Sequence, residues 1–174
     1  MGSIKFEIVS CCSDNVRPLG QSKDETHVTA HSEIEDCTRE WTFRESDFDF
    51  VHIRYLLGCI PDWEVFFKEA FKVLKPGGYL ESYEASPRVY SDDGTLSDKD
   101  AIAQWGPLFI EGGKAIGRSF TIVDDGTQKE AMEKAGFVDI QEKLIKVSPS
   151  TSVICKYLTE VQRFLAGHGR RTQS

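Results

Sequence analysis

The segment between residues 49 and 84 constrains the fold more than any other part of this chain of 174 residues. Residues 49–54 are rich in apolar side chains and follow a turn-like segment, which predicts a buried strand. An apolar stripe at helical spacing comes next, with Asp62 placed to cap its first turn. The stripe stops at the Lys-Pro-Gly-Gly sequence of residues 75–78, where glycine and proline end helices. Residues 78–84 predict a second strand, so the unit is a crossover between two parallel strands.

The chain before this unit has little regular patterning. Residues 4–9 alternate loosely and predict a short strand. Residues 10–32 are polar and show neither helical nor strand periodicity, so we expect a disordered or poorly packed segment there.

The chain after this unit predicts more helices and another strand. Helical segments lie between residues 98 and 117, with breaks expected at Gly106-Pro107 and Gly112-Gly113. A further helix starts near Asp125 and ends at residues 135–136, and residues 137–147 alternate as a strand. The tail from residue 148 has one helical patch, at residues 153–165, and then frays. Alternating strands and helices indicate an α/β fold.

Charge and hydropathy exclude two classes of partner. A formal net charge of −7 argues against a surface that binds nucleic acid or an anionic membrane. No apolar run approaches the roughly 20 residues that a membrane-spanning helix needs. Arg170 and Arg171 cluster near the C-terminus, where we expect them to be solvated.

The chain has five cysteines, an odd count without C-x-x-C spacing. This pattern fits neither a disulfide framework nor a zinc site. We therefore expect reduced thiols in a protein of the cytoplasm or the nucleus.

Two groups of motifs carry a resemblance to a known family. The sequence of residues 48–54, Trp63 and residues 73–80 resembles the fourth strand, the following helix and the fifth strand of class I S-adenosylmethionine (SAM) dependent methyltransferases. Residues 35–43, 84–87, 104–107 and 117–137 are more narrowly similar to fungal LaeA-like methyltransferases of secondary metabolism. The resemblance covers residues 33–146. It implies a partial Rossmann-like sheet with flanking helices, SAM as methyl donor and a small-molecule methyl acceptor.

The resemblance also implies cofactor-binding residues. Asp36 and Cys37 match the positions that contact the adenine, with a solvated loop as the alternative. His52, Ile53, Arg54 and Tyr55 match the positions that line the methionine end of SAM, with a satisfied core histidine as the alternative for His52.

Methyl transfer asks mainly for positioning, because the sulfonium is already an activated donor. A general base helps when the acceptor is a hydroxyl or an amine. Glu81, Glu84 and His52 are the candidates in this sequence, and a structural role is the favoured reading for each.

The chain departs from the family in the features that hold the cofactor. The family's glycine loop and the acidic residue after its second strand would precede Asp36, where the glycines are Gly2 and Gly20. We therefore expect a truncated form whose affinity for SAM is millimolar or absent. The domain boundaries that follow are a short strand and irregular segment at residues 1–32, a partial methyltransferase domain at residues 33–147, and a non-family tail at residues 148–174.

Two alternatives stay open at this point. The mismatched segments start at Val9-Ser10 and Val147-Ser148, a dipeptide that a translated splice donor would encode, so they are either retained introns or a diverged loop and tail. The second alternative concerns function: a non-catalytic methyltransferase remnant or partner-binding module. In that case residues 48–54 form a strand with an unpaired edge, which invites a protein partner or self-association.

Overall fold

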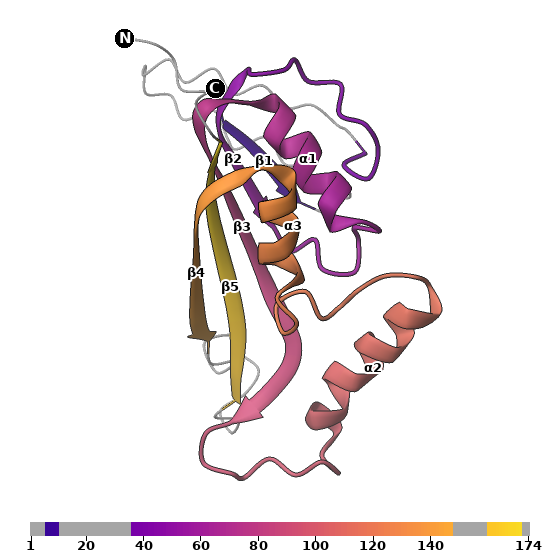
Figure 1. Cartoon of the computed structure of the whole chain (residues 1–174). Coiled ribbons are helices and arrows are strands. Elements are labelled where there is room, and N and C mark those ends of the chain that lie inside the picture. The colour runs from indigo at the N-terminus through magenta and orange to yellow at the C-terminus, as the bar shows by residue number, and fades with distance from the viewer. Residues whose placement is uncertain (1–5, 11–35, 148–159, 172–174) are drawn as a thin grey trace, which may run out of the picture.

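The computed structural model describes residues 6–10, 36–147 and 160–171, which form an α/β fold (Figure 1). In chain order the elements are β1 (Phe6–Ser10), β2 (Phe48–Arg54), α1 (Trp63–Val73), β3 (Leu74–Ser91), α2 (Ala101–Ala115), α3 (Thr127–Ala135), β4 (Phe137–Val147) and β5 (Glu160–Arg171). The predicted crossover of strand, helix and strand is confirmed as β2, α1 and β3, and β2 pairs in parallel with β3.

The strands form one sheet in the order β1-β2-β3-β5-β4. β1 pairs in parallel with β2, whereas β5 is antiparallel to both of its neighbours, β3 and β4. β2 therefore has a partner along each edge. The prediction of an unpaired edge at residues 48–54 is wrong, because the short strand predicted near residues 4–9 pairs there as β1.

Helices α1 and α3 lie side by side on the same face of the sheet (Figure 1). The apolar core lies between α1, α3 and the strands. Asp62 is the N-cap of α1 as predicted, and its Oδ1 accepts hydrogen bonds from the backbone N–H groups of Glu64 (2.9 Å) and Val65 (3.1 Å). The buried face of α1 packs with inward side chains of β2 and β3 in one apolar cluster. Members of that cluster that are completely buried include Val51, Ile53, Phe67, Ala70 and Leu80.

Helix α1 ends next to its predicted stop, at Val73, but strand β3 already starts at Leu74 and not at residue 78, so the Lys-Pro-Gly-Gly sequence belongs to the strand. The prediction of breaks within residues 98–117 is wrong. α2 is one helix through both expected breaks. The glycines of α2 serve close packing instead: a Cβ on Gly106 would lie 3.0 Å from the Cα of Arg88, and one on Gly113 would overlap the ring of Phe120.

The C-terminal segment also differs from the prediction. Residues 160–165 of the expected helix at 153–165 belong to strand β5, while residues 153–159 lie outside the described residues, as do residues 11–32 of the irregular segment. Helix α3 and strand β4 are confirmed. No helix of the described residues is long and apolar enough to cross a membrane.

Two sequence-based expectations about single residues are corrected. Cys59 is disulfide-bonded and not a reduced thiol, whereas Cys37 is free. Arg170 and Arg171 are not merely solvated, since both lie in β5. The guanidinium carbon of Arg170 lies 4.7 Å from the centre of the Tyr79 ring.

Arg171 ties β5 to the end of α1. Its Nη1 donates to the carbonyl oxygens of Lys72 (3.3 Å) and Leu74 and to the hydroxyl of Ser46 (3.1 Å). The same guanidinium lies over the ring of Phe71, 4.8 Å from its centre. A cation at this place is favoured by the helix dipole, and it adds a charged donor to the carbonyl of Lys72, which also accepts from the N–H of Ser46.

Replacing Arg171 with alanine is expected to lower the free energy of unfolding by about 1–2 kcal/mol, because carbonyls at the end of α1 lose a charged donor. Arg170→Ala is the matched control, since Arg170 is exposed and is expected to change stability by less than about 1 kcal/mol. Urea denaturation of both variants measures the difference. Equal losses would show that Arg171 does not anchor β5.

Candidate functional site

A sharp turn follows the carboxyl end of β2, beside the middle of the longer strand β3. Tyr55 adopts a left-handed backbone conformation, with φ at 57°, directly after the last residue of β2. Its N–H donates to the carbonyl of Tyr83 on β3 (3.2 Å), and the two rings meet edge to face at 5.9 Å. Burial raises the pKa of Tyr83, and Tyr55 adds to that effect. Open parallel sheets bind ligands at such carboxyl ends.

Glu84 holds this turn in place from β3. Its side chain is fully buried, and its two oxygens accept from the N–H groups of Leu56 and Leu57, each at 2.9 Å. Burial raises the pKa of Glu84 to about 7, outweighing these two hydrogen bonds, which favour the carboxylate. Because both oxygens face backbone donors, Glu84 positions the turn and does not present a base to a substrate.

His52 lies on the other face of the sheet. Its neighbours Val51 and Ile53 point into the core, so His52 points to the opposite side, away from the buried cluster. Its Nδ1 lies 2.7 Å from Oε2 of Glu81, and its ring stacks at 6.4 Å on that of Phe50. His52 and Glu81 satisfy each other, which supports the structural reading of both residues.

Arg54 is exposed at the end of β2, and its guanidinium carbon lies 5.4 Å from the centre of the Tyr55 ring. The structure therefore brings Arg54 and Tyr55 together at the carboxyl end of β2, beside Tyr83 and Glu84 in the middle of β3. His52 is on the same strand as Arg54 and the same face of the sheet, two residues earlier.

Asp36 and Cys37 stand in a separate turn. Oδ1 of Asp36 accepts from the N–H (3.0 Å) and the hydroxyl (2.7 Å) of Thr38, and Oδ2 lies 3.1 Å from Nε of Arg39. The Thr38 hydroxyl is the main cause of a lowered pKa for Asp36. Cys37 is half-buried, which raises the pKa of its thiol. The Asp36 carboxylate is thus bonded within its own turn.

Trp41 docks this turn on α1. The indole N–H of Trp41 donates to the carbonyl of Cys37 (3.3 Å), and its backbone N–H donates to Oε2 of Glu69 on α1 (3.0 Å). Its buried ring meets that of Phe66 edge to face at 5.5 Å. Asp36 and Cys37 are therefore held through α1, whereas Arg54 and Tyr55 are held through β3.

The part of the chain that the structure describes does not offer an open glycine cradle after β2. Gly58 has a left-handed backbone, with φ at 75°, but a Cβ there would overlap the ring of Phe120, so that ring already fills the space. The N-terminus of α1 is taken by the carboxylate of Asp62. The turn after β2 and the start of α1 therefore do not fit the backbone cradle that a nucleotide-like cofactor needs.

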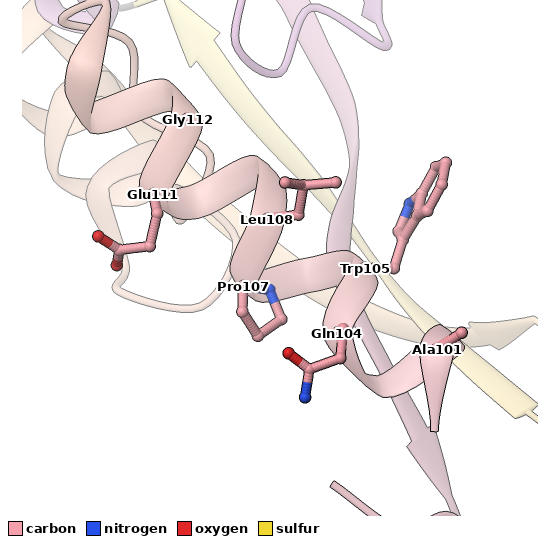
Figure 2. A pocket seen from close by; sticks show the side chains of 7 residues that line it. All are labelled: Ala101, Gln104, Trp105, Pro107, Leu108, Glu111 and Gly112. Carbon is pink, nitrogen blue, oxygen red and sulfur yellow. The ribbon is translucent and has the colours of Figure 1, made fainter. Parts of the chain in front are cut away.

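A hollow of about 460 Å³ lies elsewhere, along the outer side of α2 (Figure 2). All of its lining residues belong to that helix: Ala101, Gln104, Trp105, Pro107, Leu108, Glu111 and Gly112. It shares no residue with the turn after β2, so the two features are distinct.

Comparison with known proteins decides the family. A family model described as a methyltransferase domain matches residues 5–142. The chain belongs to this methyltransferase family. The resemblance inferred from residues 48–54 and 73–80 is confirmed.

Relatives from fungi are similar over most of the chain. Probable methyltransferase tdiE of Emericella nidulans is 40% identical over 123 residues, which is 70% of this chain and 37% of that protein. Secondary metabolism regulator laeA of Gibberella zeae is 32% identical over 117 residues, 66% of this chain and 36% of that protein. The chain thus spans little more than a third of the length of these relatives.

Solved structures support the class I Rossmann-like fold. A SAM-dependent methyltransferase of Thermotoga maritima superposes with a TM-score of 0.51 at 18% identity, over 79% of this chain and 62% of that chain. Phosphoethanolamine N-methyltransferase 2 of Haemonchus contortus, solved in complex with SAM, gives 0.50 at 16% identity, over 79% and 36%. The expectation of a partial α/β methyltransferase sheet is confirmed.

Substituting Glu84 with glutamine is expected to remove a pH dependence of stability. With its pKa raised from 4.5 to about 7, native Glu84 holds a proton that the unfolded chain has already released in that range. The protonated Glu84 contributes fully to the free energy of unfolding below pH 4.5. This contribution, roughly 3 kcal/mol, is lost as the pH rises to about 7. Urea denaturation of both proteins, in steps of about one pH unit across this range, measures the loss. Parallel curves for the two proteins would contradict it.

Proposed function

We propose that this chain serves fungal secondary metabolism as part of a SAM-dependent methyltransferase that acts on a small-molecule acceptor. The observation that carries the proposal is the Tyr55 turn, which Glu84 of β3 fixes at the carboxyl end of the parallel strand β2. Ligands of open α/β sheets bind at that place. The fungal relatives supply the metabolic context.

Each candidate residue takes a role that fits its place. Arg54 and Tyr55 stand at the carboxyl end of β2, where they would hold the methionine end of the cofactor, while His52, bonded to Glu81, supports that strand. Asp36 and Cys37, on the turn that Trp41 docks to α1, would contact the adenine. SAM supplies an activated methyl group, so the contribution of these residues is binding and orientation.

The affinity of this chain for the cofactor is weak in this proposal. The described residues give one wall of the site, and Phe120 occupies the space beside Gly58. A cofactor held by one wall keeps much of its surface in water, which limits the binding free energy to a few kcal/mol, about that of a millimolar complex.

A second candidate function is a non-catalytic, partner-binding form of the same domain. The observation that favours it is the exposed apolar side of α2, where Trp105 and Leu108 are 50% and 67% exposed. Sustained methyl transfer by the purified chain with SAM would argue against it.

Titration of the full chain with S-adenosylhomocysteine separates binding from turnover. We expect a millimolar dissociation constant, with amide chemical-shift changes centred on Tyr55, Leu56 and Leu57 and none at Gly112 on α2. Tyr55→Gly is the matched variant, because glycine keeps the left-handed backbone while the ring is removed. It is expected to abolish those changes. Shifts confined to other residues would contradict the site, and micromolar binding would contradict the weak affinity.

A further inference from the structure

Two buried polar side chains, Ser82 on β3 and Gln128 in the first turn of α3, join the helix to the sheet. Both residues are completely buried. The side-chain Nε2 of Gln128 donates to the backbone carbonyl of Ser82, 3.1 Å away. This hydrogen bond links two segments that lie 46 residues apart in the chain.

Each of these two side chains also carries an oxygen that needs a partner. Among the described residues, neither Oγ of Ser82 nor Oε1 of Gln128 makes a hydrogen bond, and both atoms are shielded from solvent. Nearly all buried polar side-chain atoms of native proteins have a partner, which is either a protein group or an ordered water. Two such oxygens at one contact therefore indicate a bound group that bridges them.

The carbonyl of Ser82 fixes the orientation of the Gln128 amide. If the amide oxygen and nitrogen exchanged places, an oxygen would lie 3.1 Å from the Ser82 carbonyl oxygen, and two acceptors would oppose each other. Oε1 is therefore an acceptor that still needs a donor. The hydroxyl of Ser82 can both donate and accept. The bridging group must accordingly donate to Gln128, and it can accept from Ser82.

The surroundings limit this group to a small, neutral molecule. Both oxygens belong to the residues that make the Gln128–Ser82 hydrogen bond, so they lie close to it. One water bonded to two oxygens spans up to about 5.5 Å. Ile53, which pairs with Ser82 across the sheet, and Met132, one turn after Gln128 on α3, are completely buried in the apolar core. An ion in such surroundings would need a charged partner.

We propose that one structural water is bound between Oγ of Ser82 and Oε1 of Gln128, at the junction of β3 and α3. The water donates a hydrogen to Oε1 of Gln128 and accepts the hydroxyl hydrogen of Ser82, so both oxygens have a partner. Tyr83 and Glu84, the next two residues of β3, hold the turn after β2. The water secures the preceding residue to α3, and its presence does not depend on the proposed function.

NMR spectroscopy of the full, isotope-labelled chain tests for this water. We expect cross-peaks from water to the side-chain amide protons of Gln128, with the sign of a contact that lasts nanoseconds or longer. Ser82→Ala removes one of the two partners and is expected to weaken these cross-peaks at least about threefold. Ser86→Ala is the matched control, since Ser86 is equally buried on the same side of β3 but donates to Asp124 (2.8 Å). It is expected to leave the cross-peaks unchanged.

Magnetic relaxation dispersion of the solvent counts long-lived waters independently. Ser82→Ala is expected to lose about one such water and Ser86→Ala none. Circular dichroism checks that each variant keeps the fold, and the wild-type cross-peaks test the site without any variant. A wild-type Gln128 amide without water cross-peaks would overturn the proposal, as would an unchanged water count in Ser82→Ala. A Ser82 hydroxyl proton in direct contact with the Gln128 amide would also overturn it, because the two side chains would then satisfy each other.

Discussion

The carboxylate of Glu84 is the contact on which the candidate site depends. It lies fully buried under the sharp turn after β2, and both of its oxygens accept backbone hydrogen bonds, from Leu56 and Leu57. Without an acceptor these two N–H groups would be left unpaired beside a completely buried Leu56, which costs more than the hydrogen bonds themselves provide. The turn therefore has a defined shape because a strand residue satisfies it, and Tyr55 can keep its unfavourable backbone angle.

The sequence predicted the parts of the fold that local patterns control. The strand at residues 48–54, the Asp62 cap and the strand from residue 137 follow from periodicity and capping chemistry, and they are confirmed. The same patterns give a wrong prediction for α2, because glycine and proline usually end helices when only neighbouring residues are considered. Gly106 and Gly113 are required by tertiary contacts with Arg88 and Phe120, which no local pattern contains. The domain boundaries at residues 33 and 147 stay a prediction.

The tail was misread for a similar reason. Residues 160–165 satisfy a helical pattern, yet they pair between β3 and β4, where backbone donors and acceptors of both strands would otherwise lack partners. Arg171 then meets carbonyls nearly a hundred residues earlier in the chain, at the end of α1. The anchoring role of Glu84 was within reach, because strand alternation places it on the same inward side as Leu80 and Ser82. Asp36 and Cys37 could be placed only through Trp41, a contact that spacing does not reveal.

The contacts of Glu84 and Trp41 show which parts of the candidate site are fixed by internal hydrogen bonds. The turn after β2 is fixed from β3, and the Asp36 turn is fixed from α1, so both parts of the candidate wall are built before any ligand binds. The space beside Gly58, in contrast, is filled by Phe120, which also packs against α2 through Gly113 and Phe109. The Phe120 ring thus packs both beside Gly58, in the turn after β2, and against the buried side of α2. Because Phe120 fills this space, the described residues hold α2 firmly but leave no room for a backbone cradle beside Gly58. The outer apolar side of α2 stays exposed to solvent.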